Sequence, residues 1–235
     1  KHEFEKFLAS RKIDLTTSEK YKLGIAPPNN AISNYIGTIK DPGERELAQK
    51  ISLEIGVIKP DLQDPKSHYD TFRDRIMFPI WDQFGQLVGY TSRSIRPEQK
   101  AKYLNSNESF VFNKKNILYG LHLAKNHIRE KDSVVLVEGN MDQIALSSHG
   151  FSNCVAIQGI ALAESTLQNL ANLSKNFILA LDNDQAGYKA AQRIHLDCLK
   201  KEITCLWIDL TPHKDPDEFI QNEGPLSFKQ RLEMA

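Results

Sequence analysis

The chain has 235 residues, 40% of them hydrophobic, and its 30 basic residues balance 30 acidic ones. This composition is typical of a globular protein with one large or two modest domains, and it excludes a disordered chain. No run approaches the roughly 18 apolar residues that a membrane span needs, and no apolar signal-peptide stretch follows the charged first residues. We therefore expect a soluble, cytoplasmic protein that does not contact a membrane.

In chain order, the first half is irregular. We expect helices over residues 4–10 and 44–55, a break at Pro27 and Pro28, and a loop containing Pro60 and Pro65. Its clearest element is a hairpin, because two apolar runs at 76–80 and 87–90 flank a glycine-containing turn at 82–85. We place the boundary between the halves near Asn113, ahead of a helix over 116–129.

A local excess of cations marks residues 93–131. It comprises Arg93, Arg96, Lys100, Lys102, Lys114, Lys115, Lys125, Arg129 and Lys131, against Glu98, Glu108 and Glu130. Cations beside an acidic site suit a polyphosphate ligand, although a solvated charged surface explains this composition equally well.

The second half alternates between two patterns. Apolar runs at 134–137, 154–157, 177–181 and 204–208 are separated by helical patterns at 141–149, 163–173 and 186–201. This alternation predicts an α/β fold, with a parallel sheet covered by helices on both faces. Ligands of such sheets bind at the carboxyl ends of the strands.

Acidic residues follow two of these strands directly. Glu138 follows the first strand, and Asp182 and Asp184 follow the third, where alternation points both aspartates to one side. Carboxylate oxygens suit Mg²⁺ or Mn²⁺. The three cysteines, Cys154, Cys198 and Cys205, lack the paired spacing of a zinc site or a disulfide framework, so we expect buried thiols and no zinc.

Each acidic motif also has a purely structural interpretation. Asp184 is well placed to cap the following helix, and Asp142 lies near a helix start where the dipole favours an anion. The motif at 215–218 is typical of a turn, in which Pro216 stiffens a loop and holds the flanking carboxylates in place.

The pairing of Glu-Gly after one strand with Asp-x-Asp after another resembles the TOPRIM domain. Nearly the whole chain is similar to bacterial DnaG-type DNA primases. The strings that carry the resemblance are GIAPP (24–28), RIMFPI (75–80), KYLNS (102–106), LYGL (118–121), EGNMD (138–142), DNDQAG (182–187) and DPDE (215–218).

The resemblance implies an amino-terminal primase-core subdomain at 1–115, a TOPRIM catalytic domain at 116–222 and the start of a helical region at 223–235. It implies catalytic, metal-binding roles for Glu138, Asp182 and Asp184. The remaining implied metal residues are Asp142, Asp215 and Asp217. The implied DNA- and nucleotide-binding residues are Arg11, Arg93, Lys102, Asn105 and Lys114.

The implied activity is the synthesis of RNA primers from ribonucleoside triphosphates on a single-stranded DNA template, with two or more Mg²⁺ or Mn²⁺ ions. A replicative helicase would bind only through regions outside this sequence. Since no zinc ribbon or carboxy-terminal helical region is present, we expect a fragment or a compact viral or mobile-element relative, which would act in the host cytoplasm if virus-encoded.

The chain departs from the family pattern at three places. Thr91 and Ser92 replace a Gly-Gly pair, Asn140 replaces an aromatic residue, and Asn183 replaces a glycine. We expect Asn183 to preserve the turn, because asparagine tolerates unusual backbone angles. Two other functions stay open: a TOPRIM nuclease with the same acidic site, and a non-catalytic nucleic-acid-binding module, which the intact carboxylates disfavour.

Overall fold

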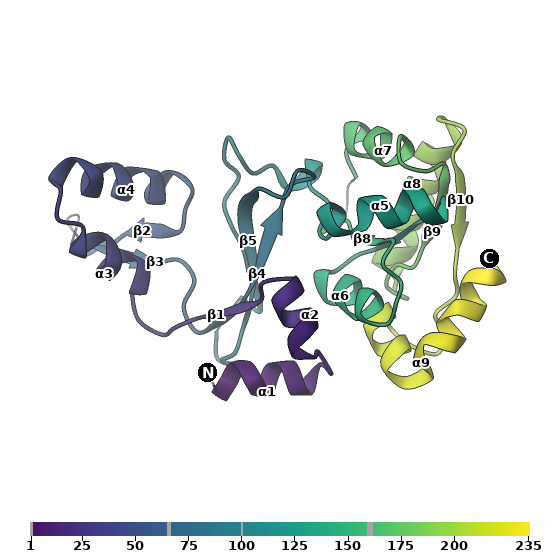
Figure 1. Cartoon of the computed structure of the whole chain (residues 1–235), viewed down its shortest axis with the longest axis horizontal. Coiled ribbons are helices and arrows are strands. Elements are labelled where there is room, and N and C mark those ends of the chain that lie inside the picture. Colours follow the sequence, from purple (N-terminus) through teal and green to yellow (C-terminus); the bar gives the residue numbers. More distant parts are fainter. Residues whose placement is uncertain (1, 65–66, 100, 159–161) are drawn as a thin grey trace. The chain divides into compact units, whose positions relative to one another are not determined.

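The structure is a computed structural model that describes residues 2–64, 67–99, 101–158 and 162–235. The chain forms two compact units, one comprising Lys1–Ile80 and Val88–Asn113, the other Trp81–Leu87 and Lys114–Ala235 (Figure 1). Pro65 and Lys100, from the predicted loop and basic segment, lie outside the described residues. Of the helices in the described ranges, none is long and apolar enough to cross a membrane.

The first unit is built around a four-stranded sheet. Its strand order is β1 (Gly24–Ala26), β4 (Arg75–Trp81), β5 (Leu87–Ser94) and β6 (Tyr103–Asn105). The predicted hairpin is confirmed by the neighbouring strands β4 and β5, whose connection contains Gly85 with a φ of 82°. Ile76, Phe78 and Ile80 of β4 are completely buried, as alternation along the strand requires.

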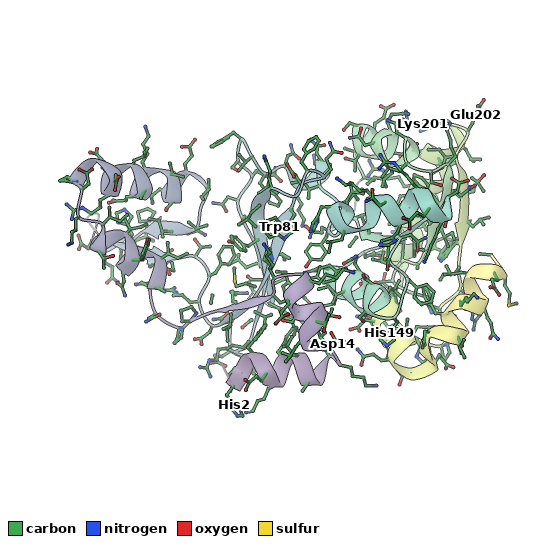
Figure 2. All side chains as sticks on the ribbon, in the orientation of Figure 1. His2, Asp14, Trp81, His149, Lys201 and Glu202 are labelled. Carbon is green, nitrogen blue, oxygen red and sulfur yellow. The ribbon has the colours of Figure 1, made fainter. Side chains whose placement is uncertain are left out.

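Helices and a small second sheet complete this unit. They are α1 (His2–Ser10), α2 (Leu15–Lys20), α3 (Ala31–Thr38), α4 (Pro42–Glu54), β2 (Ile58–Pro60) and β3 (His68–Asp70). Helix α2 was not predicted from the sequence. Asp14, labelled in Figure 2, begins it by accepting a hydrogen bond from the Thr17 amide at 2.6 Å. Helix α3 was not predicted either, and its first turn is held by the buried carboxylate of Asp70.

The second unit confirms the predicted α/β class. Its four strands are all parallel, in the order β10 (Thr204–Trp207), β9 (Asn176–Leu179), β7 (Val134–Val137), β8 (Cys154–Ala156). All four residues of β7 are fully buried because the strand lies between two neighbours and under helices on both faces. That position explains its unbroken apolar sequence.

The helices around this sheet in the described part of the unit are α5 (Leu121–Lys131), α6 (Asn140–Ser148), α7 (Glu164–Ala171), α8 (Gln185–Leu199) and α9 (Pro216–Glu233) (Figure 1). One buried cluster joins the sheet to α5, α7 and α8. The helices α6 and α9 pack together, and the rings of Phe219 and Phe228 on α9 lie 5.8 Å apart. Trp81 from the end of β4, labelled in Figure 2, also belongs to this unit. The centre of its ring lies 5.8 Å from the centre of the His122 ring on α5.

Two details of the prediction are wrong. The helix expected from residue 116 begins at Leu121, because Gly120 has a left-handed φ of 83°, and a short 3-10 turn, η1 (Lys114–Asn116), precedes it. The motif at 215–218 is not a loop, since Pro216 occupies the first position of α9, where its missing N–H costs nothing. The thiols of Cys154 and Cys198 are buried as expected, whereas Cys205 is only half-buried.

Candidate functional site

The carboxylates after β7 and β9 meet at the carboxyl edge of the sheet. Glu138 follows β7 directly, and its Oε1 accepts a hydrogen bond of 3.2 Å from the backbone N–H of Asp182. Because β7 and β9 are parallel neighbours, their ends lie at the same edge and bring these residues together.

Gly187, in the first turn of α8, allows this close approach. A Cβ added there would overlap the carbonyl oxygen of Asp182 and would lie 2.8 Å from Oε1 of Glu138. The position therefore excludes any side chain, and Gly187 was not among the site residues predicted from the sequence. Its only sequence signal is its place at the end of the DNDQAG string.

Asp142 connects α6 to α9. One of its oxygens accepts a hydrogen bond from the Gly139 amide at 3.1 Å, and the other accepts one from the Asp217 amide at 3.2 Å. The Asp217 carboxylate in turn accepts a hydrogen bond of 2.6 Å from Gln221. Asp142 and Asp217 are both buried, so these bonds satisfy polar groups that water does not reach.

Asp184 and Asp215 are helix caps, as the structural interpretation of Asp184 predicted. Oδ1 of Asp184 accepts hydrogen bonds from Ala186 and Gly187 at 2.8 and 2.9 Å, and Oδ1 of Asp215 accepts one from Glu218 at 2.8 Å. In both residues the capping bonds use only Oδ1. Capping and metal binding are therefore compatible in each case.

The carboxylates are close enough to repel one another. The pKa of Asp182 is raised to about 7 by burial and by the charges of Glu138 and Asp215, while Lys214 opposes the rise. Burial, and secondarily the charge of Asp184, raises the pKa of Glu138. Burial and the charges of Asp215 and Asp182 hold the pKa of Asp142 well above its usual value. Such mutual perturbation is typical of a functional site.

A divalent cation fits the chemistry of this donor set. All the donors are carboxylate oxygens, which suit Mg²⁺ or Mn²⁺ and disfavour zinc. A cation would also offset both the burial and the mutual repulsion that raise these pKa values. Within the described part of the chain, however, no three His, Cys, Asp or Glu side chains already converge with the spacing of a bound ion.

Four of the five predicted nucleic-acid-binding residues, Arg11, Arg93, Lys102 and Asn105, belong to the first unit, and Lys114 begins η1 in the second. The guanidinium of Arg93 lies 5.9 Å from the ring centres of both Phe7 and Tyr103. These two rings were missed. Tyr103 adjoins Lys102 in the KYLNS string, whereas nothing in the sequence connects Phe7 with Arg93.

The structure shows the environment of the residues at the three departures from the family pattern. Ser92 is fully buried and donates a hydrogen bond of 2.9 Å to the Leu104 carbonyl, and Asn140 is buried near the start of α6. Asn183 does not have a left-handed backbone. The expected reason for its tolerance is therefore wrong, and its side chain instead contacts the loop before α9.

The parallel sheet and its acidic edge define the class of the second unit. A Toprim-like family model matches residues 135–220, and Toprim domains bind divalent metal ions. A second model, the N-terminal domain of the DNA primase catalytic core, matches residues 1–125. The chain therefore belongs to the DnaG-type DNA primase catalytic core family.

Individual relatives agree with this assignment. The DNA primase of Pseudomonas putida is 35% identical over 96% of this chain and 34% of its own length, so the chain spans about a third of that relative. The E. coli primase catalytic core is 29% identical, with a TM-score of 0.88 over 100% of this chain and 73% of that one. A DnaG primase catalytic domain bound to ssDNA is 29% identical, with a TM-score of 0.85 over 99% of this chain and 71% of that one.

Proposed function

We propose that this chain synthesises short RNA primers from ribonucleoside triphosphates on single-stranded DNA in the cytoplasm. The observation that carries the proposal is the meeting of Glu138 and Asp182 at the carboxyl edge of the sheet, where the Asp182 N–H donates to Oε1 of Glu138 at 3.2 Å. Burial there, together with the charges of Glu138 and Asp215, raises the pKa of Asp182 to about 7. Membership of the primase core family and a similar core bound to ssDNA support the choice of reaction.

In this proposal Glu138, Asp182 and Asp184 hold divalent ions as the catalytic residues, with Asp142, Asp215 and Asp217 completing the site. Bound ions would neutralise the triphosphate and lower the pKa of the attacking 3′-hydroxyl. The Asp182 backbone N–H orients the Glu138 carboxylate, and Gly187 lets α8 approach it. Asp142 ties the start of α9, which carries Asp217, to α6.

We assign the binding of the template and of the incoming nucleotide to the basic residues. Arg11, Arg93, Lys102 and Lys114 would contact phosphates, and Asn105 would donate or accept a hydrogen bond beside them. Arg93, flanked by the rings of Phe7 and Tyr103, presents a charge that is already held in place.

The test is to incubate the chain with ribonucleoside triphosphates, single-stranded DNA and Mg²⁺ or Mn²⁺, and to analyse the RNA and the DNA on the same gel. We expect RNA products that disappear with EDTA. Cleavage of the DNA without RNA synthesis would instead favour a Toprim nuclease. Binding of the DNA with neither reaction would favour a non-catalytic module.

A further inference from the structure

Asn183 lies between the two aspartates of the proposed metal site and contacts the segment that carries a third. Its backbone N–H donates a hydrogen bond of 2.6 Å to the Lys214 carbonyl. Its side-chain Nδ2 donates two more, to Oγ1 of Thr211 and to the His213 carbonyl, each at 3.3 Å. Three bonds from one residue thus join the end of β9 to the loop between β10 and α9.

The loop at 211–214 is also anchored from its other side. Nε2 of His213 lies 2.9 Å from Glu223 on α9, and the Lys214 amide donates a hydrogen bond of 2.7 Å to Glu218. Arg231, near the end of α9, donates to the Thr211 carbonyl at 3.3 Å. Only Asn183 among these partners comes from the segment that carries Asp182 and Asp184.

The hydrogen bonds of Asn183 oppose the electrostatic repulsion between the two acidic segments that they connect. Asp182 and Asp215 are both acidic and lie on the two segments that Asn183 joins, so their charges repel each other across these bonds. Without a cation, repulsion favours separation of the two segments, whereas metal binding requires their carboxylates to be close. A bond that holds the segments together before the ion arrives reduces the reorganisation that binding must include.

We infer that Asn183 is a positioning residue that holds the Asp182–Asp184 segment and the Asp215 segment at the separation needed to bind a divalent cation. This inference rests on the proposed function of the acidic site and deepens it. The backbone bond to Lys214 is available to every residue except proline, so the specific contribution of Asn183 is its pair of side-chain bonds. Asparagine suits the position because its Nδ2 carries two hydrogens, one for each acceptor.

The experiment measures Mn²⁺ affinity by calorimetric titration of the whole chain without DNA or nucleotides. We expect Asn183→Ala to raise the Kd for Mn²⁺ by about three- to tenfold, the range for losing one or two modest hydrogen bonds. Asn222→Ala is the matched control, because Nδ2 of Asn222 donates to the Glu218 carbonyl within α9 and joins no second segment. Its Kd should equal that of the wild type.

A double-mutant cycle with Thr211→Val separates positioning from general destabilisation. If the Asn183 to Thr211 bond acts on metal binding, the effects of the two substitutions on the Kd will be less than additive. Additive effects, or wild-type Mn²⁺ affinity in Asn183→Ala, would overturn the inference while leaving the acidic site intact. Failure of the wild-type chain to bind Mn²⁺ would overturn the proposed function and this inference together.

Discussion

Several carboxylates in this chain have a structural role in addition to the metal-binding role that we propose for them. Asp184 and Asp215 cap helices through one oxygen, and Asp142 bridges α6 and α9. Glu138 and Asp182 differ from these three, because each lies at a strand end and contacts the other. Removing Glu138 or Asp182 should therefore affect chemistry most and folding least.

We expect Asp182→Ala or Glu138→Ala to abolish nucleotide incorporation while leaving the chain folded. The substitution removes a proposed metal ligand, and it also removes a charge that neighbouring carboxylates oppose, so the metal-free protein should melt at the same temperature or higher. Primer synthesis and thermal melting followed by circular dichroism test both parts. Asp197→Ala, on α8 and paired with Lys200, is the control. Incorporation at the wild-type rate in either variant would remove that residue from the site.

Gly187→Ala tests the close approach of α8 to the acidic edge. The new Cβ would overlap the Asp182 carbonyl, which belongs to the backbone and cannot rotate away, so we expect a loss of about 1–3 kcal/mol in the free energy of unfolding. Urea denaturation measures it. In Gly37→Ala, on α3, the added methyl meets nothing within 4 Å, and that variant should be neutral or gain up to about 1 kcal/mol. Equal stability of the two variants would show that α8 is not closely packed at Gly187.

At the scale of elements, the N-termini of three helices lie at the candidate acidic site. The helices α6, α8 and α9 all begin at the carboxyl edge of the sheet, and each has an acidic residue in or beside its first turn. A helix start favours negative charge through its dipole, which partly offsets the repulsion among the carboxylates. The same residues therefore stabilise the helices and assemble the candidate site.

Two substitutions of Asp184 can separate its role as a helix cap from its proposed role as a metal ligand. Asn is as good an N-cap as Asp, so Asp184→Asn should keep the wild-type stability, whereas Asp184→Ala should lose about 1 kcal/mol. Both variants should bind Mn²⁺ more weakly, because both lack the charge. Asp41→Ala, which removes the N-cap of α4 in the first unit, should lose stability without changing Mn²⁺ affinity. Full Mn²⁺ affinity in Asp184→Asn would make Asp184 a cap alone.

At the scale of the whole molecule, the formal net charge is zero, but the charged residues of the two proposed sites lie mostly in different units. The carboxylates of the candidate metal site belong to the second unit, while Arg11, Arg93 and Lys102 belong to the first. We therefore expect local charge, rather than the total, to govern which ligand each unit attracts, since fields from distant charges are screened in physiological salt.

We expect affinity for single-stranded DNA to fall steeply between about 50 and 200 mM salt, because phosphate contacts release counterions. Arg93→Ala and Lys102→Ala should weaken binding and reduce the salt slope by about one each. Fluorescence anisotropy with a labelled oligonucleotide measures both quantities. Lys50→Ala on α4 is the control and should bind as the wild type does. Affinity independent of salt would mean that these residues do not contact phosphates.

Sequence patterns were most informative where structure is locally determined. The alternation of buried strands and amphipathic helices in the second unit was read correctly because periodicity depends on neighbouring residues alone. In the first unit, β1 and α3 could not be predicted from periodicity. The three residues of β1 are all half-buried, and α3 is held by Asp70 from far along the chain. Short elements of this kind carry too few residues for a period to be visible.

By itself, the sequence determined the α/β class, the parallel sheet and the placing of Glu138, Asp182 and Asp184 after strands that end at one edge. Only the tertiary structure decided what joins those residues to the rest of the site. The bond from Asp217 to Asp142 spans 75 positions, and the contacts of Asn183 with Thr211 and His213 span about 30. Contacts between segments so far apart leave no periodic signal, because they depend on how two loops meet in space rather than on the order of residues within either.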